Sequence, residues 1–311
     1  MCDPVEAFIN LKPITSGNTM EPSLQTHAPR TDDTLWDFFP LIMCINLRER
    51  ADRFEEVKSE FRRVGMRQVV FFRAERQPDR DAAIIDSHMA CLRYAVERNV
   101  EHVLVFEDDA LFLEDYRTNM AHALEFLRTR SDWNLFHFGG FIFRKVEFVT
   151  PHILRGALLN VHAVVVRTGF AKIILEKRRY CEGMSVDLFY SALNGDNSFV
   201  HVNPLICIQR PSASDGSWDK QSKNKDGWLG NAMIYTSLDR AGRLRFNHFS
   251  RMERFRIENG IWFFNVYRPI CRRRIARAEA RARRNQFSPV EPRAEGTFVE
   301  VDLTDGSDAR G

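Results

Sequence analysis

A run of four apolar residues followed by three carboxylates constrains this chain more than any other segment. Residues Val103–Phe106 have the composition of a buried strand, and Glu107, Asp108 and Asp109 follow without a break. Adjacent carboxylates repel, so a fold that places them beside a hydrophobic strand usually supplies a cation or a shared proton. Alternation along an extended chain sends Glu107 and Asp109 to one side and Asp108 to the other. Two converging carboxylates suit Mg²⁺ or Mn²⁺, and a solvated acidic turn is the alternative.

The order of the predicted elements indicates the fold class. Apolar runs predict strands at 41–47, 69–72, 103–106, 133–138, 157–167 and within 199–208. Helical spacing predicts helices at 51–64, 81–99, 115–129, 168–179 and around Asp187. Strands separated by helices of this length indicate an α/β domain with a largely parallel sheet. Ligands gather at the carboxyl ends of strands in such sheets, which is where the acidic block lies.

Changes in composition divide the chain into four parts. Residues 1–38 are rich in Pro, Thr, Ser and Asp and are predicted to be a poorly ordered leader. One catalytic domain is expected over 39–250, followed by an aromatic and basic helical extension over 251–286. Residues 287–311 are acidic and contain Pro and Gly, which predicts a disordered tail.

The cysteines and the hydropathy bear on the compartment. Six cysteines are scattered without a CxxC pair or a zinc spacing, which favours reduced thiols in a reducing environment. The leader lacks the basic and apolar regions of a secretory signal, and no apolar run approaches the eighteen residues of a spanning helix. We therefore expect a cytoplasmic protein, with peripheral membrane attachment as an alternative.

Five blocks carry a resemblance to a known family. In chain order they are Ile45–Arg48 with Asp52–Glu55, then Ser87–His88, then Val105–Ala110, then His162–Ala163 followed by Arg167–Gly169, and finally Val186–Asp187 with Gln209–Asp215. On these blocks the chain resembles the family 25 glycosyltransferases, which include bacterial lipooligosaccharide galactosyltransferases and the collagen galactosyltransferases. The blocks span about residues 40–216, and the acidic block and the final Gln-Arg-Pro-Ser-x-Ser-Asp block are the distinctive ones.

The resemblance implies a GT-A-like nucleotide-diphospho-sugar domain that inverts the anomeric carbon. The expected reaction moves a hexose from a UDP-sugar to a hydroxyl group, and galactose is the favoured sugar. The acceptor hydroxyl belongs to a glycan, a lipid-linked molecule or a protein. A Mn²⁺ or Mg²⁺ ion held by Asp109 with Glu107 or Asp108 would neutralise the leaving diphosphate. His162 is a candidate for a further metal ligand or a diphosphate contact, against a structural role.

Inversion also needs a base on the acceptor hydroxyl. Asp187 is the first candidate because it opens a helix in the second half of the domain, and Asp215 is the second. The alternative for Asp187 is a helix N-cap.

Two arginines after the first strand and one in the last block are candidates for phosphate contacts. Arg48 and Arg53 could each form a bidentate contact with two phosphate oxygens. An ordinary solvated position at the start of a helix is the alternative, and it is favoured for Arg53. Arg210 could bind a phosphate or pair with Asp215.

The Ser87–His88 pair is the other candidate donor contact. A hydrogen-bonded core histidine is the alternative for His88, which lies on the apolar face of its helix. Family members usually carry Gly-Cys four residues ahead of this pair, where Ala83 and Ile84 stand here. The missing glycine predicts a narrower pocket or a different choice of sugar.

The carboxyl end combines aromatic and basic residues. Arg268–Arg284 contains eight arginines and one acidic residue, and aromatic residues at 262–264 and 267 precede it. This composition is typical of a segment that binds an anionic membrane surface. Nucleic acid is a less favoured partner because the chain shows no nucleic-acid module, and a solvated helix packed on the domain is the third interpretation.

Two other function classes remain open at this point. One is a non-catalytic descendant of the family that binds nucleotide sugars, which an intact acidic block argues against. The other is a metal-dependent phosphoryl-transfer or hydrolytic enzyme that uses the same carboxylates. A dinucleotide-binding dehydrogenase is disfavoured, because Asn46–Arg50 stands where a GxGxxG turn would follow the first strand.

Overall fold

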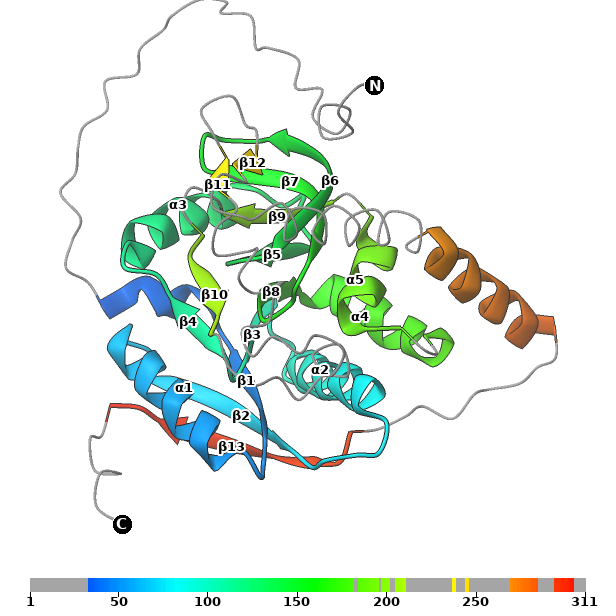
Figure 1. Ribbon diagram of the computed structural model, residues 1–311, viewed down its shortest axis with the longest axis horizontal. Helices are drawn as coiled ribbons and strands as arrows, with labels where there is room; N and C mark the ends of the chain where they lie inside the picture. Colours follow the sequence, from blue (N-terminus) through cyan, green and yellow to red (C-terminus); the bar gives the residue numbers. More distant parts are fainter. Residues whose placement is uncertain are drawn as a thin grey trace, which may run out of the picture.

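A nine-stranded sheet forms the centre of the molecule (Figure 1). The computed structural model describes residues 33–181, 184–195, 197–201, 205–210, 237–238, 244–245, 269–284 and 294–304. In spatial order the strands are β13 (Gly296–Asp302), β2 (Gln68–Ala74), β1 (Ile42–Leu47), β3 (His102–Glu107), β8 (Ala163–Arg167), β5 (Leu135–His137), β9 (Ser198–His201), β7 (Ile153–Leu159) and β6 (Phe141–Phe148). Two small pairs lie apart from it: β4 (Ala110–Phe112) with β10 (Cys207–Gln209), and β11 (Ser237–Leu238) with β12 (Leu244–Arg245).

Most strands of the large sheet run in one direction. Strand β1 pairs in parallel with both β2 and β3, and β5 pairs in parallel with β9. Strands β13, β8 and β7 run the opposite way to their neighbours. The α/β class with a largely parallel central sheet is therefore confirmed, and the uninterrupted parallel group β2-β1-β3 carries the acidic block at its edge.

Helices cover both faces of the sheet. They are α1 (Ala51–Arg63), α2 (Arg80–Glu97), α3 (Tyr116–Thr129), α4 (Thr168–Lys177), α5 (Val186–Asn194), a helix over 269–284, and the short 3-10 helices η2 (Asp33–Phe38) and η3 (Arg178–Tyr180). One face packs against α1, α3 and η2, and the other against α2, α4, α5 and the helix over 269–284.

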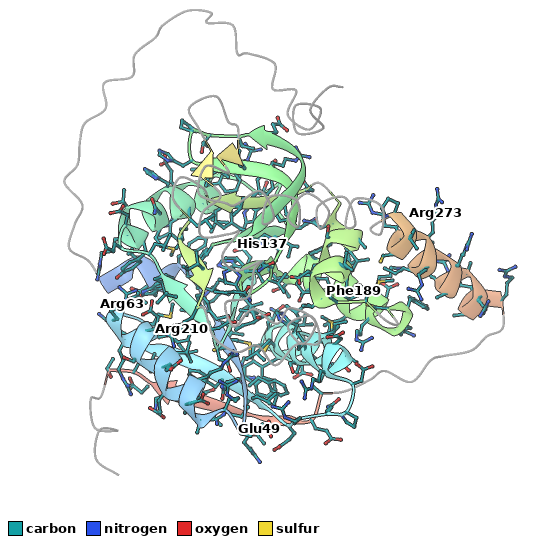
Figure 2. The ribbon with its side chains drawn as sticks, viewed as in Figure 1. Glu49, Arg63, His137, Phe189, Arg210 and Arg273 are labelled. Carbon is teal, nitrogen blue, oxygen red and sulfur yellow. The ribbon has the colours of Figure 1, made fainter. Side chains whose placement is uncertain are left out.

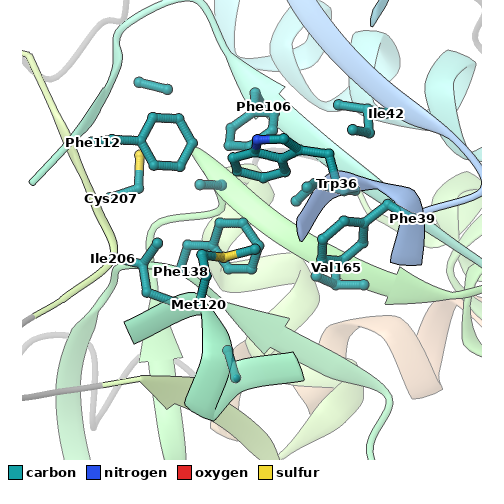
Figure 3. Close-up of a cluster of buried hydrophobic side chains, with 14 of the residues drawn as sticks. Trp36, Phe39, Ile42, Phe106, Phe112, Met120, Phe138, Val165, Ile206 and Cys207 are labelled. Atoms are coloured by element: carbon teal, nitrogen blue, oxygen red, sulfur yellow. The ribbon is translucent and has the colours of Figure 1, made fainter. Parts of the chain in front are cut away.

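The alternation of β3 explains the two cores. Leu104 and Phe106 point into the core under α1 and α3, whereas Val103 and Val105 point into the core under α2 and α4. Because β3 is covered on both faces, its sequence is a continuous apolar run. Figure 3 shows the first core, in which Phe106 lies among other aromatic side chains.

Order begins before the predicted start near residue 39. Helix η2 lies inside the segment predicted to be a poorly ordered leader, and Trp36 in it is only 5% exposed. The Trp36 indole donates a hydrogen bond of 2.9 Å to the carbonyl of Val64, at the end of α1. Aromatic residues that fill a core outweigh the polar composition around them.

The single strand predicted at 157–167 is two strands. Strand β7 ends at Leu159 and β8 begins at Ala163, and Asn160 lies between them with a φ of 70°. Asparagine adopts this left-handed conformation more readily than other non-glycine residues, so a break in the apolar run is possible here without glycine.

The predicted disordered tail over 287–311 is wrong for residues 296–302. This segment is β13, and it pairs antiparallel with the whole of β2, from Gly296 opposite Ala74 to Asp302 opposite Gln68. The Phe298 ring packs 4.4 Å from Tyr94 and 4.9 Å from Phe72, measured between ring centroids. Glu300 and Asp302 gave the segment the composition of a disordered tail. In the structure they face solvent on an edge strand, where charge is favourable.

Within the described part of the chain, no helix is long and apolar enough to cross a membrane.

Candidate functional site

The candidate site lies where β1 and β3 end side by side. Ile45 pairs with Glu107 in the parallel register, so Asn46 and the carboxylates 107–109 meet at one edge of the sheet. This is the edge at which open α/β sheets bind ligands. Beyond Asp109 the chain enters β4, which pairs with β10 and brings Gln209 and Arg210 to the same place.

Asp108 points toward α1 and is held by two side chains of the protein. Asn46 Nδ2 donates to it over 2.7 Å, and an Arg53 nitrogen donates over 2.9 Å. Burial raises the pKa of the Asp108 carboxyl, while Arg53 and Asn46 act against that increase. The expectation of a solvated Arg53 is wrong, because this residue is only 7% exposed and forms a buried ion pair. Asp108 therefore anchors the end of β3 to α1.

Glu107 points to the opposite face, as the alternation predicted. His88 Nε2 of α2 lies 3.3 Å from one carboxylate oxygen, and Gln209 Nε2 donates to the other over 3.5 Å. Burial and then the Asp108 charge raise the pKa of Glu107 to about 7. Burial lowers the pKa of His88 to about 4, so the imidazole is neutral at physiological pH. His88 is thus both a buried residue and a direct contact of the acidic block.

Asp109 is the carboxylate with unmet bonding capacity. Burial, followed by the charges of Glu107 and Asp108, raises its pKa well above the ordinary value. Its Oδ1 atom is buried and has no hydrogen-bond partner among the described residues. The backbone is fixed, because the Arg210 N–H donates to the Asp109 carbonyl over 2.6 Å. A buried carboxylate oxygen without a donor is chemically suited to a divalent cation.

A complete metal cage is not present in the described part of the chain, where no three His, Cys, Asp or Glu side chains are grouped to hold an ion. Mg²⁺ and Mn²⁺ that act on nucleotides are commonly bound by one or two carboxylates together with substrate phosphates and water. The residues present fit a site that substrate phosphates and water would complete. They do not form a site in which the protein supplies every ligand.

Asp187 reaches the same cluster from α5. Ser185 caps this helix, with its side chain accepting from the Leu188 N–H at 3.4 Å, so Asp187 is in the first turn and is not the N-cap. The Asp187 carboxylate accepts hydrogen bonds from the backbone N–H groups of Asn160 and Val161. Burial and then the Glu107 charge raise its pKa to about 6.

The side chains of Asn160 and Gln209 connect the Asp187 carboxylate to the Glu107 carboxylate. Asn160 Nδ2 donates to Gln209 Oε1 over 2.7 Å, and Gln209 in turn donates to Glu107. Asn160 also accepts from His137 through its carbonyl at 3.1 Å. Sequence reasoning did not identify Asn160 as a site residue. The only clue was its place between two apolar runs, two residues before His162 in the fourth block.

His162 is completely buried behind the acidic block. Its carbonyl accepts from the Glu107 N–H at 2.8 Å, and its Nε2 lies 3.5 Å from the Cys207 carbonyl. Gly139 is required at this crossing, because a Cβ there would lie 1.9 Å from the Cys207 carbonyl oxygen. Burial lowers the pKa of His162 to about 4, which keeps the ring neutral, the form that binds metals. Its role as a metal ligand stays a prediction.

The remaining predicted donor-binding residues have other partners within the protein. Arg48 is exposed and contacts Glu75 at 2.7 Å and Thr297 at 3.1 Å. The Arg210 side chain, labelled in Figure 2, pairs with Glu56 of α1 according to the distance between their charged atoms.

Ser87 and Asp215 complete the set of predicted site residues. The Ser87 hydroxyl donates to the Ala83 carbonyl over 2.8 Å, within its own helix. Asp215, the second candidate base, lies outside the described residues.

The comparisons with known proteins give little beyond this geometry. No family model matches the chain, and no curated protein matches it. One similar solved structure is the crystal structure of a glycosyltransferase involved in the glycosylation of the major capsid of PBCV-1. The two are 11% identical with a TM-score of 0.35, over 50% of this chain and 76% of that chain. A likeness at this level says nothing about the chemistry of the site.

Proposed function

We propose that this chain is an inverting glycosyltransferase that moves a hexose from a UDP-sugar to a hydroxyl acceptor. The observation that carries the proposal is the pair Asp109 and Asp187. These half-buried carboxylates come from separate halves of the domain and face one cluster, through Glu107, at the edge where the parallel strands end. One has an unpartnered oxygen suited to a cation, and the other has a raised pKa suited to proton transfer.

Asp109 is the proposed metal ligand, with Glu107 or Asp108 beside it. When bound, Mn²⁺ or Mg²⁺ would supply positive charge against the developing charge of the leaving nucleoside diphosphate. The contacts favour Glu107 over Asp108 as the second ligand. Asp108 accepts short bonds of 2.7 and 2.9 Å from the protein, whereas the contacts of Glu107 are longer, at 3.3 and 3.5 Å. His162 stays a third candidate from the sequence, although the described residues do not group three such side chains around one point.

Asp187 is the proposed general base. As the acceptor oxygen bonds to the anomeric carbon, its proton passes to the Asp187 carboxylate and the bond between that carbon and the diphosphate oxygen breaks. A base whose pKa is about 6 is ionised at neutral pH and still basic enough to take a proton in the transition state. The two backbone donors at Asn160 and Val161 hold the carboxylate in one orientation.

The sugar and the acceptor come from the resemblance stated above, which makes galactose the first donor sugar to test. Glycan, lipid-linked and protein hydroxyl groups remain the acceptor classes.

Ligand-detected binding of a panel of UDP-sugars in the presence and absence of Mn²⁺ tests the donor, and mass spectrometry of glycosylated acceptors tests the transfer. Sugar transfer that requires an acceptor supports the proposal. Metal-dependent consumption of the donor without any acceptor would instead identify a hydrolytic enzyme. Tight donor binding with no turnover for any acceptor would identify a binding protein.

A further inference from the structure

The helix over 269–284 has two faces of different character. Its inner face is docked on the domain: Cys271 and Ile275 are buried in the same core as α4 and α5. Glu279 pairs with Lys177 of α4 at 2.8 Å, and Arg272 donates to the Ala192 carbonyl of α5 over 2.8 Å. Figure 1 shows this helix beside α4 and α5 at the margin of the molecule.

The outer face of the helix, which we call the arginine face, consists of Arg273, Arg277, Arg281 and Arg284 together with Ile270. The four arginines follow an i, i+4, i+8, i+11 spacing, so they lie in one row along the helix. All five side chains are exposed, and Ile270 is 42% exposed. The row is roughly 16 Å long at 1.5 Å per residue, and Figure 2 shows Arg273 on this outer side.

No acidic side chain in the described part of the chain pairs with the arginine face. Glu279 is the acidic residue of this helix, and it is used on the inner side by Lys177 and by Arg283. Like charges four residues apart destabilise a helix, so the row works against the stability of the element that carries it. A solvated surface helix would be more stable with Glu at some of these positions.

We propose that the arginine face binds the surface of an anionic lipid bilayer. A straight row of guanidinium groups on a rigid support matches a flat layer of phosphate headgroups, and an exposed isoleucine on the same face can enter the interface. Aromatic residues precede the helix in the sequence at 262–264 and 267, as in interfacial segments. Nucleic acid is less well matched, because this face presents no aromatic ring for stacking among its described residues.

The docking contacts give the bilayer a defined orientation relative to the candidate site. Arg272 bonds to α5, and α5 carries Asp187, so the helix with the arginine face is attached directly to the helix of the proposed base. A lipid-linked acceptor would therefore approach from the side of α5. This last step rests on the proposed function, whereas membrane binding does not.

Co-sedimentation of the full-length protein with phosphatidylcholine vesicles, with and without phosphatidylglycerol, tests the binding without any activity assay. The double variant Arg277→Gln, Arg281→Gln should bind anionic vesicles about 30-fold more weakly, which corresponds to about 1 kcal/mol for each arginine. The matched control is Arg117→Gln, Arg128→Gln on α3. It removes the same charge from exposed positions of a helix on the other face of the sheet, and it should leave binding unchanged.

The proposal fails if the two double variants weaken binding equally, because net charge alone would then explain it. It also fails if the wild-type protein ignores anionic vesicles, or if it binds a single-stranded oligonucleotide at a salt concentration that releases the vesicles. Undiminished sugar transfer to a lipid-linked acceptor in vesicles by the Arg277, Arg281 variant would contradict the assigned orientation. Loss of vesicle binding in Asp187→Asn would contradict the separation of membrane binding from the proposed catalytic base.

Discussion

Asn160 and Gln209 are joined by a hydrogen bond of 2.7 Å between their side-chain amides. Each also contacts one of the candidate carboxylates, Asn160 through its backbone N–H to Asp187 and Gln209 through its side chain to Glu107. The turn between β7 and β8 is thereby connected to β10 and to the end of β3. A change in this turn should affect the position of both carboxylates.

Two substitutions of Asn160 distinguish the effect of backbone strain from the effect of losing its side-chain hydrogen bond to Gln209. Asn160→Gly and Asn160→Ala both remove the bond to Gln209, but only alanine is strained at a φ of 70°. Both variants should lower kcat with little change in KM. The alanine variant should also lose roughly 1 kcal/mol more unfolding free energy than the glycine variant. Denaturant unfolding and steady-state kinetics measure these effects, and a glycine variant with normal kcat would show that the amide bond does not position Asp187.

Asp109→Asn should abolish metal-dependent donor binding. An amide oxygen is a weaker ligand than a carboxylate, and the substitution keeps the shape of the side chain. Titration calorimetry with a UDP-sugar, with and without Mn²⁺, measures the effect, and circular dichroism checks that the fold is retained. Unchanged metal dependence would place the metal site elsewhere.

Asp187→Asn should lower kcat by about 10²–10⁴-fold with donor affinity little changed, as expected for loss of a general base. For the wild-type enzyme, kcat should fall about tenfold per pH unit below the Asp187 pKa of about 6, because protonation removes the base. The variant should lose this acidic limb. Turnover close to that of the wild type would shift the assignment to Asp215.

Glu107→Gln should stabilise the fold in a pH-dependent way. The pKa of Glu107 is about 7 in the folded protein and lies above its ordinary value, so the ionised form disfavours folding. That cost is absent at pH values below the ordinary pKa, increases as the pH rises toward 7, and is fully present above it. Above pH 7.5 the variant should therefore gain about 3 kcal/mol in unfolding free energy, and near pH 4 it should gain little. Comparison of the two proteins at each pH cancels the contribution of the histidines. A pH-independent difference would show that Glu107 is not buried as a charge.

Deletion of residues 295–311 should destabilise the domain although it removes none of the candidate site. The deletion exposes β2 along its length and removes the Phe298 ring from Tyr94 and Phe72. The melting temperature should fall by several degrees, since loss of about 1 kcal/mol shifts it by a few degrees in a domain of this size. A deletion variant with an unchanged melting temperature would mean that β13 adds nothing to stability.

The sequence predicted the elements of the parallel group because their patterns are strong and local. Continuous apolar residues at 41–45 and 103–106 identify strands buried on both faces, and Gly65, with a φ of 81°, follows the end of the helix predicted at 51–64. That Glu107 and Asp108 point to opposite sides of the sheet also followed from alternation alone.

The contacts that define the site depend on residues far apart in the chain, and no local pattern indicates them. Arg53 has the spacing of an exposed helix position, yet its partner Asp108 is fifty-five residues away and holds it in the interior. Gln209 belonged to a recognised block, but its bond to Asn160 depends on the pairing of β10 with β4. The edge strand β13 has little buried surface, so hydrophobic periodicity could not identify it.

The pairing of β13 with β2 has a consequence for biosynthesis. Phe72 of β2 leaves the ribosome long before its partner Phe298 of β13. The edge of β2 therefore stays unpaired until most of the chain has been translated. Such an edge can recruit strands from other molecules. We expect the time between synthesis of β2 and synthesis of β13 to govern chaperone dependence and loss to aggregation during expression.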